Sequence, residues 1–383
     1  MHLDKQRLAD YNKGRVLEII AKEGPINRAK IAKKLDLSIP TIMKIAEEFI
    51  NEGIIKVVGK AESTGGKRPD LYEIVKDAYY CIGVDLGRFR LKIIVSNLKG
   101  EIVLRKVEEI SHISEVSVVL NILEQKIDEI IKEAQISNEK IMGIGLAVPG
   151  IIESKTGKVL YSPDFGWEAV DLVSPLREKF GLWIAIENSN RAEALGEKWI
   201  GVAQNAHNIF SVNIGHGIGA TILKGDEVYR GSSGAAGEFG HIILKKDGPL
   251  CDCGNYGCLE ALSSGNAIAK RMNKKEAKEV FDLAKAGNLQ AKEIIDEAIE
   301  YLGIGIAGVI NLFDPDMVVL SGGVVQSYDM FGERLRKTIK ERQIKYGGRN
   351  VKINVGMLGE DATAIGATVL LIKNFKNNGG QIA

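Results

Sequence analysis

Three of the four cysteines in this 383-residue chain lie within eight residues of one another. Cys251, Cys253 and Cys258 form the segment CDCGNYGC, whose two glycines allow a short loop to turn all three sulfurs toward one ion. Such a cluster in a long chain indicates metal binding before disulfides, and thiolates are preferred ligands of structural zinc. The alternative is three reduced cysteines without a metal. Cys81, in an apolar run, is expected in the core.

Glycine-rich turns recur at residues 83–87, 215–219 and 322–323, each after an apolar strand. Glycine lets the backbone N–H groups of such a turn approach a phosphate closely. One turn alone is a weak signal, but three are typical of actin-like sugar kinases, which hold a nucleotide between two lobes. The candidate residues of these loops are Asp85, Gly87, Gly215, Gly217, Gly322 and Gly323.

Strands and helices alternate through the body of the chain, from residue 77 onward, and this alternation predicts an α/β fold with ligand loops at the strand ends. We predict a first lobe over 77–188, onto which a C-terminal helix at 361–375 packs back, and a second lobe over 189–360. Strands are predicted at 80–87, 91–95, 141–148, 183–187, 209–213 and 317–320, and helices at 114–135, 191–200 and within 265–312.

Residues 1–76 have a different pattern, with three short helices in succession. The first ends at the breaker pair Gly24-Pro25, and Asn27 can cap the second. Ser38 is suited to the N-cap of the third, with Pro40 in its first turn. The buried face of the third helix is expected to hold Ile42, Ile45, Phe49 and Ile50.

Two predicted strands, 54–58 and 71–75, follow these helices and flank the basic segment GGKRP. Three helices and a hairpin with a basic tip predict a winged helix-turn-helix that binds DNA; the alternative is a small helical interaction domain. Side chains on the third helix would approach base edges and the wing tip would contact phosphate or a minor groove. The candidate DNA contacts are Arg28, Ser38, Thr41, Lys44, Lys67 and Arg68.

The net charge of +1 is unevenly divided. Residues 1–76 hold 15 Lys and Arg against 11 Asp and Glu, whereas the rest holds 36 against 39. A basic head on a mildly acidic body is compatible with a DNA-binding module joined to one that does not bind DNA. Neither an apolar run of about 20 residues nor an apolar N-terminal signal is present, so a cytoplasmic protein without a membrane partner is expected.

The segments GEFGH at 237–241 and CDCGNYGCLE at 251–260 resemble the signature of the ROK family (repressors, open reading frames and kinases). The head with its GGKRP wing resembles the DNA-binding domain of the repressor branch, of the xylose and N-acetylglucosamine repressor kind. The resemblance covers essentially the whole chain. It implies a two-lobed, actin-like and ribonuclease-H-like sugar kinase fold behind the winged helix-turn-helix, and His241 as the fourth ligand of one structural zinc ion.

The same resemblance implies a sugar site. In related kinases the residues that match Glu238 and Glu260 accept hydrogen bonds from sugar hydroxyls, and a residue that matches Asn188 contacts the sugar. The second ring nitrogen of His241 could donate to the sugar, and Ser189 stands beside Asn188. The alternative for the two glutamates is an ordinary role as surface carboxylates.

Three departures from the family's kinases fall on the phosphoryl-transfer side. Ser189 stands where kinases carry the aspartate base, and a serine hydroxyl is not a base near neutral pH. Arg88 and Phe89 replace a glycine and a threonine of the first phosphate loop, and His216 replaces a threonine of the second. The zinc and sugar positions are retained, as expected of a kinase converted into a sensor.

The sequence therefore predicts a sugar-responsive transcriptional repressor with a catalytically degenerate sensing domain. Its expected partners are operator DNA, a sugar effector and further copies of itself in a homodimer or homotetramer. One structural zinc ion is expected per chain, and ATP is not. One alternative is a working ATP-dependent sugar kinase, of glucokinase or N-acetylglucosamine kinase type, that carries a DNA-binding head. Another is a zinc-stabilised carbohydrate-binding protein without a DNA role.

Overall fold

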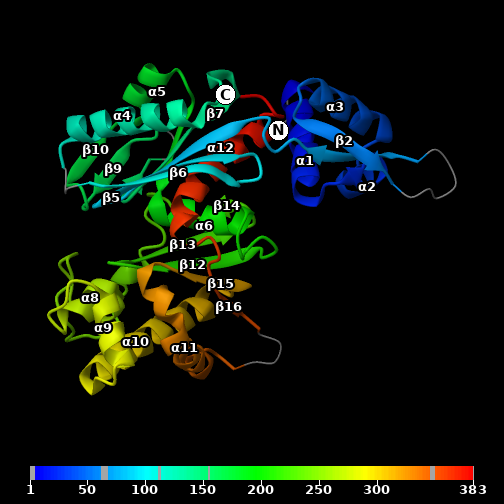
Figure 1. Ribbon diagram of the computed structural model, residues 1–383. Coiled ribbons are helices and arrows are strands. Elements are labelled where there is room, and N and C mark those ends of the chain that lie inside the picture. Colours follow the sequence, from blue (N-terminus) through cyan, green and yellow to red (C-terminus); the bar gives the residue numbers. More distant parts are fainter. Residues whose placement is uncertain (1–4, 62–67, 111–113, 154–155, 346–349, 383) are drawn as a thin grey trace. The chain divides into compact units, whose positions relative to one another are not determined.

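The computed structural model describes residues 5–61, 68–110, 114–153, 156–345 and 350–382 (Figure 1). The chain divides into two compact units. Unit one comprises residues 1–192 and 364–383 and contains both the head and the first lobe. Unit two comprises residues 193–363. The described helices include none that is long and apolar enough to cross a membrane.

The head has the helix order of a winged helix-turn-helix. Its elements are α1 (Lys5–Glu23), β1 (Ile26–Asn27), α2 (Arg28–Leu35), α3 (Ile39–Asn51), β2 (Ile55–Lys60) and β3 (Asp70–Ile74). Both predicted caps form, because Asn27 Oδ1 accepts the Lys30 N–H at 2.9 Å and Ser38 Oγ accepts the Thr41 N–H at 3.3 Å. The short strand β1 was not predicted; it pairs with β3, which also pairs with β2.

The prediction that Ile50 is buried is wrong. The buried face of α3 consists of Ile42, Ile45, Ala46 and Phe49, whereas Ile50 is 39% exposed. One residue beyond Phe49 lies about 100° further around the helix, and this rotation turns the side chain of Ile50 out of the core. Ile54, which is fully buried beyond the helix end, completes the apolar layer.

A five-stranded sheet forms the centre of the first lobe. Its strands, in spatial order, are β11 (Ile184–Asn188), β7 (Ile141–Val148), β4 (Tyr80–Leu86), β5 (Arg90–Asn97) and β6 (Ile102–Glu109). The pairs β11–β7 and β7–β4 are parallel, and β4–β5 and β5–β6 are antiparallel. The strand β6 was missed by the sequence analysis. A small antiparallel sheet is formed by β8 (Ile151–Ile152), β9 (Val159–Ser162) and β10 (Trp167–Val170).

Helices complete this lobe. They are α4 (Val116–Ala134), η1 (Asn138–Lys140), α5 (Val173–Phe180), α6 (Ser189–Trp199, which continues into unit two) and α12 (Ala362–Asn377). The helix α12 lies against the central strands because Gly83 and Gly145 have no side chain. A Cβ atom on either glycine would collide with the carbonyl oxygen of Ala364 or Ala367, respectively. The last helix of the chain is therefore part of the core of the first lobe.

Unit two repeats the strand order of the first lobe. Its sheet consists of β14 (Glu227–Val228), β13 (Ile218–Lys224), β12 (Asn208–Ile214), β15 (Met317–Ser321) and β16 (Lys352–Val355). The first three strands are antiparallel and the last three are parallel, which is the arrangement of β6-β5-β4-β7-β11. The predicted two-lobed, ribonuclease-H-like fold is thus present.

Helices surround the sheet of unit two. They are η2 (Phe239–His241), α7 (Leu259–Ser263), α8 (Gly265–Lys270), α9 (Ala277–Lys285), α10 (Leu289–Phe313), η3 (Gly323–Ser327), α11 (Tyr328–Arg342) and η4 (Gly359–Asp361). The long helix α10 contributes twelve buried residues, and the core that it shares with the sheet includes Val212, Ile306 and Leu320. A rigid core of this kind holds the loops at the strand ends in place.

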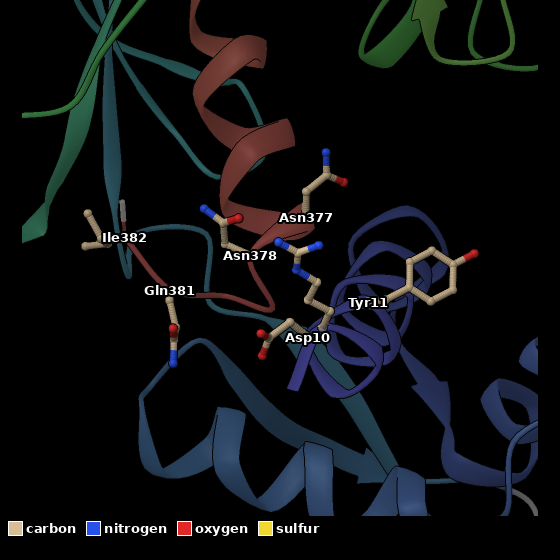
Figure 2. A pocket seen from close by; sticks show the side chains of 7 residues that line it. Asp10, Tyr11, Asn377, Asn378, Gln381 and Ile382 are labelled. Carbon is tan, nitrogen blue, oxygen red and sulfur yellow. The ribbon is translucent and has the colours of Figure 1, made fainter. Parts of the chain in front are cut away.

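The residues that follow α12 pack against the head within unit one. Gly380 adopts a φ of +88°, and a Cβ atom there would lie 2.8 Å from the ring of Phe49. Figure 2 shows a pocket that is lined by side chains of α1 and of residues 377–382. These side chains are Arg7, Asp10, Tyr11, Asn377, Asn378, Gln381 and Ile382.

Candidate functional site

The predicted metal ligands converge in unit two. One ligand atom from each of His241, Cys251, Cys253 and Cys258 lies within 4.8 Å of the other three. The sequence folds this way because an isolated β-bridge joins Ile243 to Cys258 and thereby brings the segment after η2 beside the end of the cysteine loop. Cys251 Sγ lies 3.7 Å from His241 Nδ1, and the same distance separates the sulfurs of Cys253 and Cys258.

The environments of the three thiols differ. Burial raises the pKa of Cys258 to about 12 and also raises the pKa of Cys251. The backbone N–H of Asn255 lowers the pKa of Cys253, which is the exposed member of the cluster. A bound cation would favour the thiolate form of all three. Three sulfurs and one imidazole nitrogen this close together form a donor set that can hold a metal ion.

Two of the predicted sugar ligands border this cluster. Glu238 Oε2 lies 3.9 Å from Nε2 of His241, the ring nitrogen that does not face Cys251. Glu260 follows the last cysteine on α7, and its Oε2 accepts the Ile218 N–H at 2.8 Å. Glu238, His241 and Glu260 are therefore placed together, with the metal cluster on one side and the glycine turn that precedes β13 on the other.

Asn188 and Ser189 belong to unit one, at the junction of β11 and α6. Asn188 Nδ2 donates to the carbonyl of Gly150 at 2.8 Å, and Asn188 Oδ1 accepts the Arg191 N–H at 3.2 Å. These bonds fix the amide at the start of the helix, whose first residue is Ser189.

A buried ion pair beside Asn188 was missed by the sequence analysis. Glu187 Oε1 lies 3.8 Å from Arg191 Nη1, and Glu187 Oε1 also accepts the Asn188 N–H at 2.9 Å. The available signal was a glutamate at the end of an apolar strand with an arginine four residues later. The pair rigidifies the backbone that presents Asn188 and Ser189.

The first of the predicted phosphate loops is the tight turn between β4 and β5. The Gly87 N–H donates to the Arg90 carbonyl at 2.9 Å, which leaves Arg88 and Phe89 exposed at the tip. The Arg88 guanidinium lies 5.2 Å from the centre of the Phe89 ring, so the two bulky side chains stack. Asp85, three residues before the tip, is partly buried in β4.

The other two predicted loops lie at one edge of the sheet of unit two, because β12 and β15 are parallel neighbours. Gly215 donates to the carbonyl of Gly217 at 3.0 Å, and the exposed His216 stands between them. Gly322 has a φ of +92° and passes so close to Ile214 that a side chain would not fit. Gly323 begins η3. The backbone of both turns is therefore compact, and the side chain of His216 is exposed at the first of them.

Of the described candidate DNA contacts, Ser38, Lys44 and Arg68 are exposed, whereas Arg28 and Thr41 are half-buried. Arg28 begins α2, while Ser38, Thr41 and Lys44 lie in the first turns of α3. Ser38 Oγ and Thr41 Oγ1 lie 2.8 Å apart and therefore bond to each other. Arg68 is exposed at the base of the wing. Lys67 lies outside the described residues.

Comparison with known families identifies the body of the chain. The profile of the ROK family matches residues 81–374, which include both lobes and the cysteine loop. The chain belongs to the ROK family. A winged helix-turn-helix DNA-binding profile matches residues 10–56, from α1 to β2. The predictions of the family and of a DNA-binding head are thereby confirmed.

Curated relatives of the chain include repressors. A xylose repressor of Caldicellulosiruptor bescii is 33% identical over 96% of this chain and 97% of its own length. The transcriptional dual regulator NagC of Escherichia coli K12 is 27% identical over 96% and 93%. Both similarities extend over the head and the two lobes together.

Solved structures of two kinds resemble the chain. A ROK family transcriptional regulator, a homologue of the E. coli Mlc protein, matches with a TM-score of 0.86 at 28% identity over 98% of both chains. A ROK hexokinase from Thermus thermophilus matches with a TM-score of 0.66 at 29% identity over 76% of this chain and 97% of its own. Because kinases and regulators share these lobes, the fold does not by itself decide between them.

Proposed function

We propose that the chain is a sugar-responsive transcriptional repressor that acts in the cytoplasm. Residues 1–76 would bind operator DNA, and the lobes over 77–188 (with 361–375) and 189–360 would bind the sugar. One observation carries this proposal: a winged helix-turn-helix at residues 10–56 is joined to ROK lobes over residues 81–374. The family resemblance implies that Ser189, the first residue of α6, stands where the kinases carry their base. A xylose repressor similar over 96% of the chain supports it.

The proposed sugar ligands are Glu238, His241 and Glu260 of unit two together with Asn188 and Ser189 of unit one. Carboxylates beside an imidazole are suited to sugar hydroxyls, because each buried hydroxyl needs a hydrogen-bond partner. The fixed amide of Asn188 and the anchored carboxylate of Glu260 are preorganised for this task. The names of the relatives make xylose and N-acetylglucosamine the first sugars to test.

One structural zinc ion would be held by His241 Nδ1 and the sulfurs of Cys251, Cys253 and Cys258. The donor set fits a closed tetrahedral Cys3His site without an open position for catalysis. Such an ion would fix the His241 ring and leave Nε2 directed toward Glu238. The metal would thereby shape the sugar site without reacting with the sugar.

Sugar binding would act on DNA by shifting a two-state equilibrium. A sugar whose binding residues lie on both lobes favours the arrangement in which all of these residues contact it. In a homodimer, that arrangement would change the spacing of the two heads, which must match the helical repeat of the operator. An inducer has the higher affinity for the form that does not bind DNA. By the same linkage, bound DNA lowers the affinity of the protein for the inducer.

The second candidate function is an ATP-dependent sugar kinase that carries a DNA-binding head. The compact turns at Gly215 and Gly322 and the retained Asp85 favour this candidate. Against it stand Ser189 at the base position and the stacked Arg88 and Phe89 at the tip of the first phosphate loop. A kinase without its base would lose about 10²–10⁴-fold in rate.

Two measurements on the full chain separate the candidates. The first is a thermal-shift screen of pentoses, hexoses and N-acetylhexosamines, followed by DNA-binding assays with and without the stabilising sugar. A repressor binds a specific duplex and changes its affinity when the sugar is added. The second is ATP turnover with the same sugars, for which the proposal predicts no activity near an ordinary kinase rate of about 1 s⁻¹ or more.

A further inference from the structure

The solvent-facing side of α3 carries an apolar pair. Ile39 is 44% exposed and Met43 is 46% exposed, one helical turn apart. The other exposed residues of α3 are Pro40, Lys44, Glu47, Ile50 and Asn51. The buried residues of α3 are Ile42, Ile45, Ala46 and Phe49, so Ile39 and Met43 are not part of the core of the head.

The polar residues at the start of α3 are already engaged. Ser38 Oγ caps the helix by accepting the Thr41 N–H, and it lies 2.8 Å from Thr41 Oγ1. The two hydroxyls thus serve the helix end and each other. Ile39 and Met43 are the exposed large apolar side chains in the first two turns of α3.

The surroundings of this apolar pair fit the charge of DNA. The Arg28 guanidinium donates to Met43 Sδ at 3.4 Å, which places a cation directly beside the apolar pair. The rest of α2 adds the exposed Lys30 and Lys33, and its eight residues include no acidic side chain; Lys34 is paired with Glu23 at 2.8 Å. An apolar contact flanked by cations complements a major groove, where phosphates border the base edges.

In the major groove, the C5-methyl of thymine is the apolar group that distinguishes one base from another. We propose that Ile39 and Met43 contact thymine C5-methyl groups and are specificity-determining residues of the head. This inference rests on the proposed function, because it requires that the head binds operator DNA. It predicts that thymines of each half-site are recognised through their methyl groups, with Arg28 at an adjacent phosphate or base.

The test removes single methyl groups from the DNA. A preferred duplex is enriched from random DNA with the full-length protein, and each thymine is then replaced in turn by deoxyuridine. At one or two positions per half-site, we expect affinity to fall about fourfold, the ratio that corresponds to about 0.8 kcal/mol for one buried methyl group. The variants I39A and M43A should bind the thymine and deoxyuridine duplexes equally at the position that each residue contacts.

Two control variants keep the test specific. M43L retains an apolar side chain and should retain most of the thymine preference. I50A removes the same side chain as I39A from the other end of α3, about 16 Å along the axis, and should leave every thymine-to-deoxyuridine ratio unchanged.

Each other outcome contradicts the inference in a distinct way. Selective binding with equal affinity for all deoxyuridine duplexes, or a thymine preference that survives I39A and M43A, would overturn it and leave the repressor function intact. A change of oligomeric state in I39A, without a change in the ratios, would overturn it by placing these side chains in a protein interface. Failure of the full chain to select any duplex would overturn the proposed function as well.

Discussion

The carboxylate of Glu260 accepts a hydrogen bond of 2.8 Å from the backbone N–H of Ile218. Glu260 follows the last cysteine of the metal cluster, and Ile218 follows the glycine turn at the end of β12. One side chain thus joins the cysteine loop to the glycine turn at residues 215–217. Its other oxygen, 4.0 Å from Cys251 Sγ, faces the cluster.

Replacement of Glu260 should therefore have two separable effects. E260A leaves the Ile218 N–H without its acceptor, which costs about 1–3 kcal/mol, or several degrees of melting temperature. E260Q keeps an acceptor oxygen and should melt close to the parent. Both variants should bind sugar at least tenfold more weakly in calorimetry, in proportion to one lost charged hydrogen bond. Normal sugar affinity in E260Q would remove Glu260 from the proposed site.

Metal removal should unfold the cysteine loop between Glu238 and Glu260. Elemental analysis should give about one zinc per chain, and C253S should retain much less, since binding and local folding are coupled. Sugar affinity should decline with zinc content. The matched control is C81A, because Cys81 is a buried core thiol outside the cluster. Zinc-free protein whose cluster thiols are all freely alkylated would contradict the proposed site.

Phosphoryl transfer should not be restored by one substitution. S189D returns a carboxylate to the position of the base, but Arg88 and Phe89 would still keep a phosphate away from the first loop. Only the triple variant S189D/R88G/F89T is expected to gain measurable turnover, assayed as sugar-dependent ADP release. Sugar binding should persist in both variants. An unmodified chain that turns over at a normal kinase rate would establish the second candidate function.

Arg68 at the base of the wing should act as a phosphate contact. R68A should weaken binding to all duplexes by a similar factor and lower the slope of log K against log salt by about one unit. The comparison is T41A, which alters the first turn of α3 and should change the preferred sequence. An unchanged salt slope in R68A, with unchanged affinity, would exclude the wing base from the DNA interface.

The contact between Gly380 and Phe49 should support the head. G380A introduces a side chain at positive φ and 2.8 Å from the Phe49 ring, and it is expected to destabilise the head and reduce DNA affinity. G166A is the matched control, because Gly166 also has a positive φ (+67°) but a Cβ atom there would meet no described atom within 4 Å. If G380A and G166A lost the same amount of stability and DNA affinity, backbone strain alone would explain the loss, and the contact with Phe49 would contribute nothing.

Local signals account for what the sequence predicted well. The caps at Asn27 and Ser38 depend on atoms three residues away, and the cysteine cluster depends on one short loop with its glycines. The alternating segment of β6 was equally available in the sequence, as IVLRKVEE at Ile102–Glu109, and was overlooked. To predict that Ile50 is exposed, one must know which side of α3 faces the core, and the composition of the helix does not reveal this.

Long-range relationships could not be obtained in this way. Nothing near Gly380 in the sequence indicates Phe49, and nothing near Glu260 indicates the N–H of Ile218. Such contacts depend on which distant elements meet in the fold. A single sequence, considered without its structure, does not reveal which elements these are.

The place of α12 has a consequence for the order in which the lobes mature during synthesis. Gly83 and Gly145 leave room on the first sheet that α12 fills, and α12 is synthesised after nearly all of unit two. We therefore expect the nascent first lobe to expose apolar surface until α12 has been made, and exposed apolar surface favours aggregation and chaperone binding. Truncation after Thr363 should therefore prevent the whole first lobe from folding stably, rather than remove one peripheral helix.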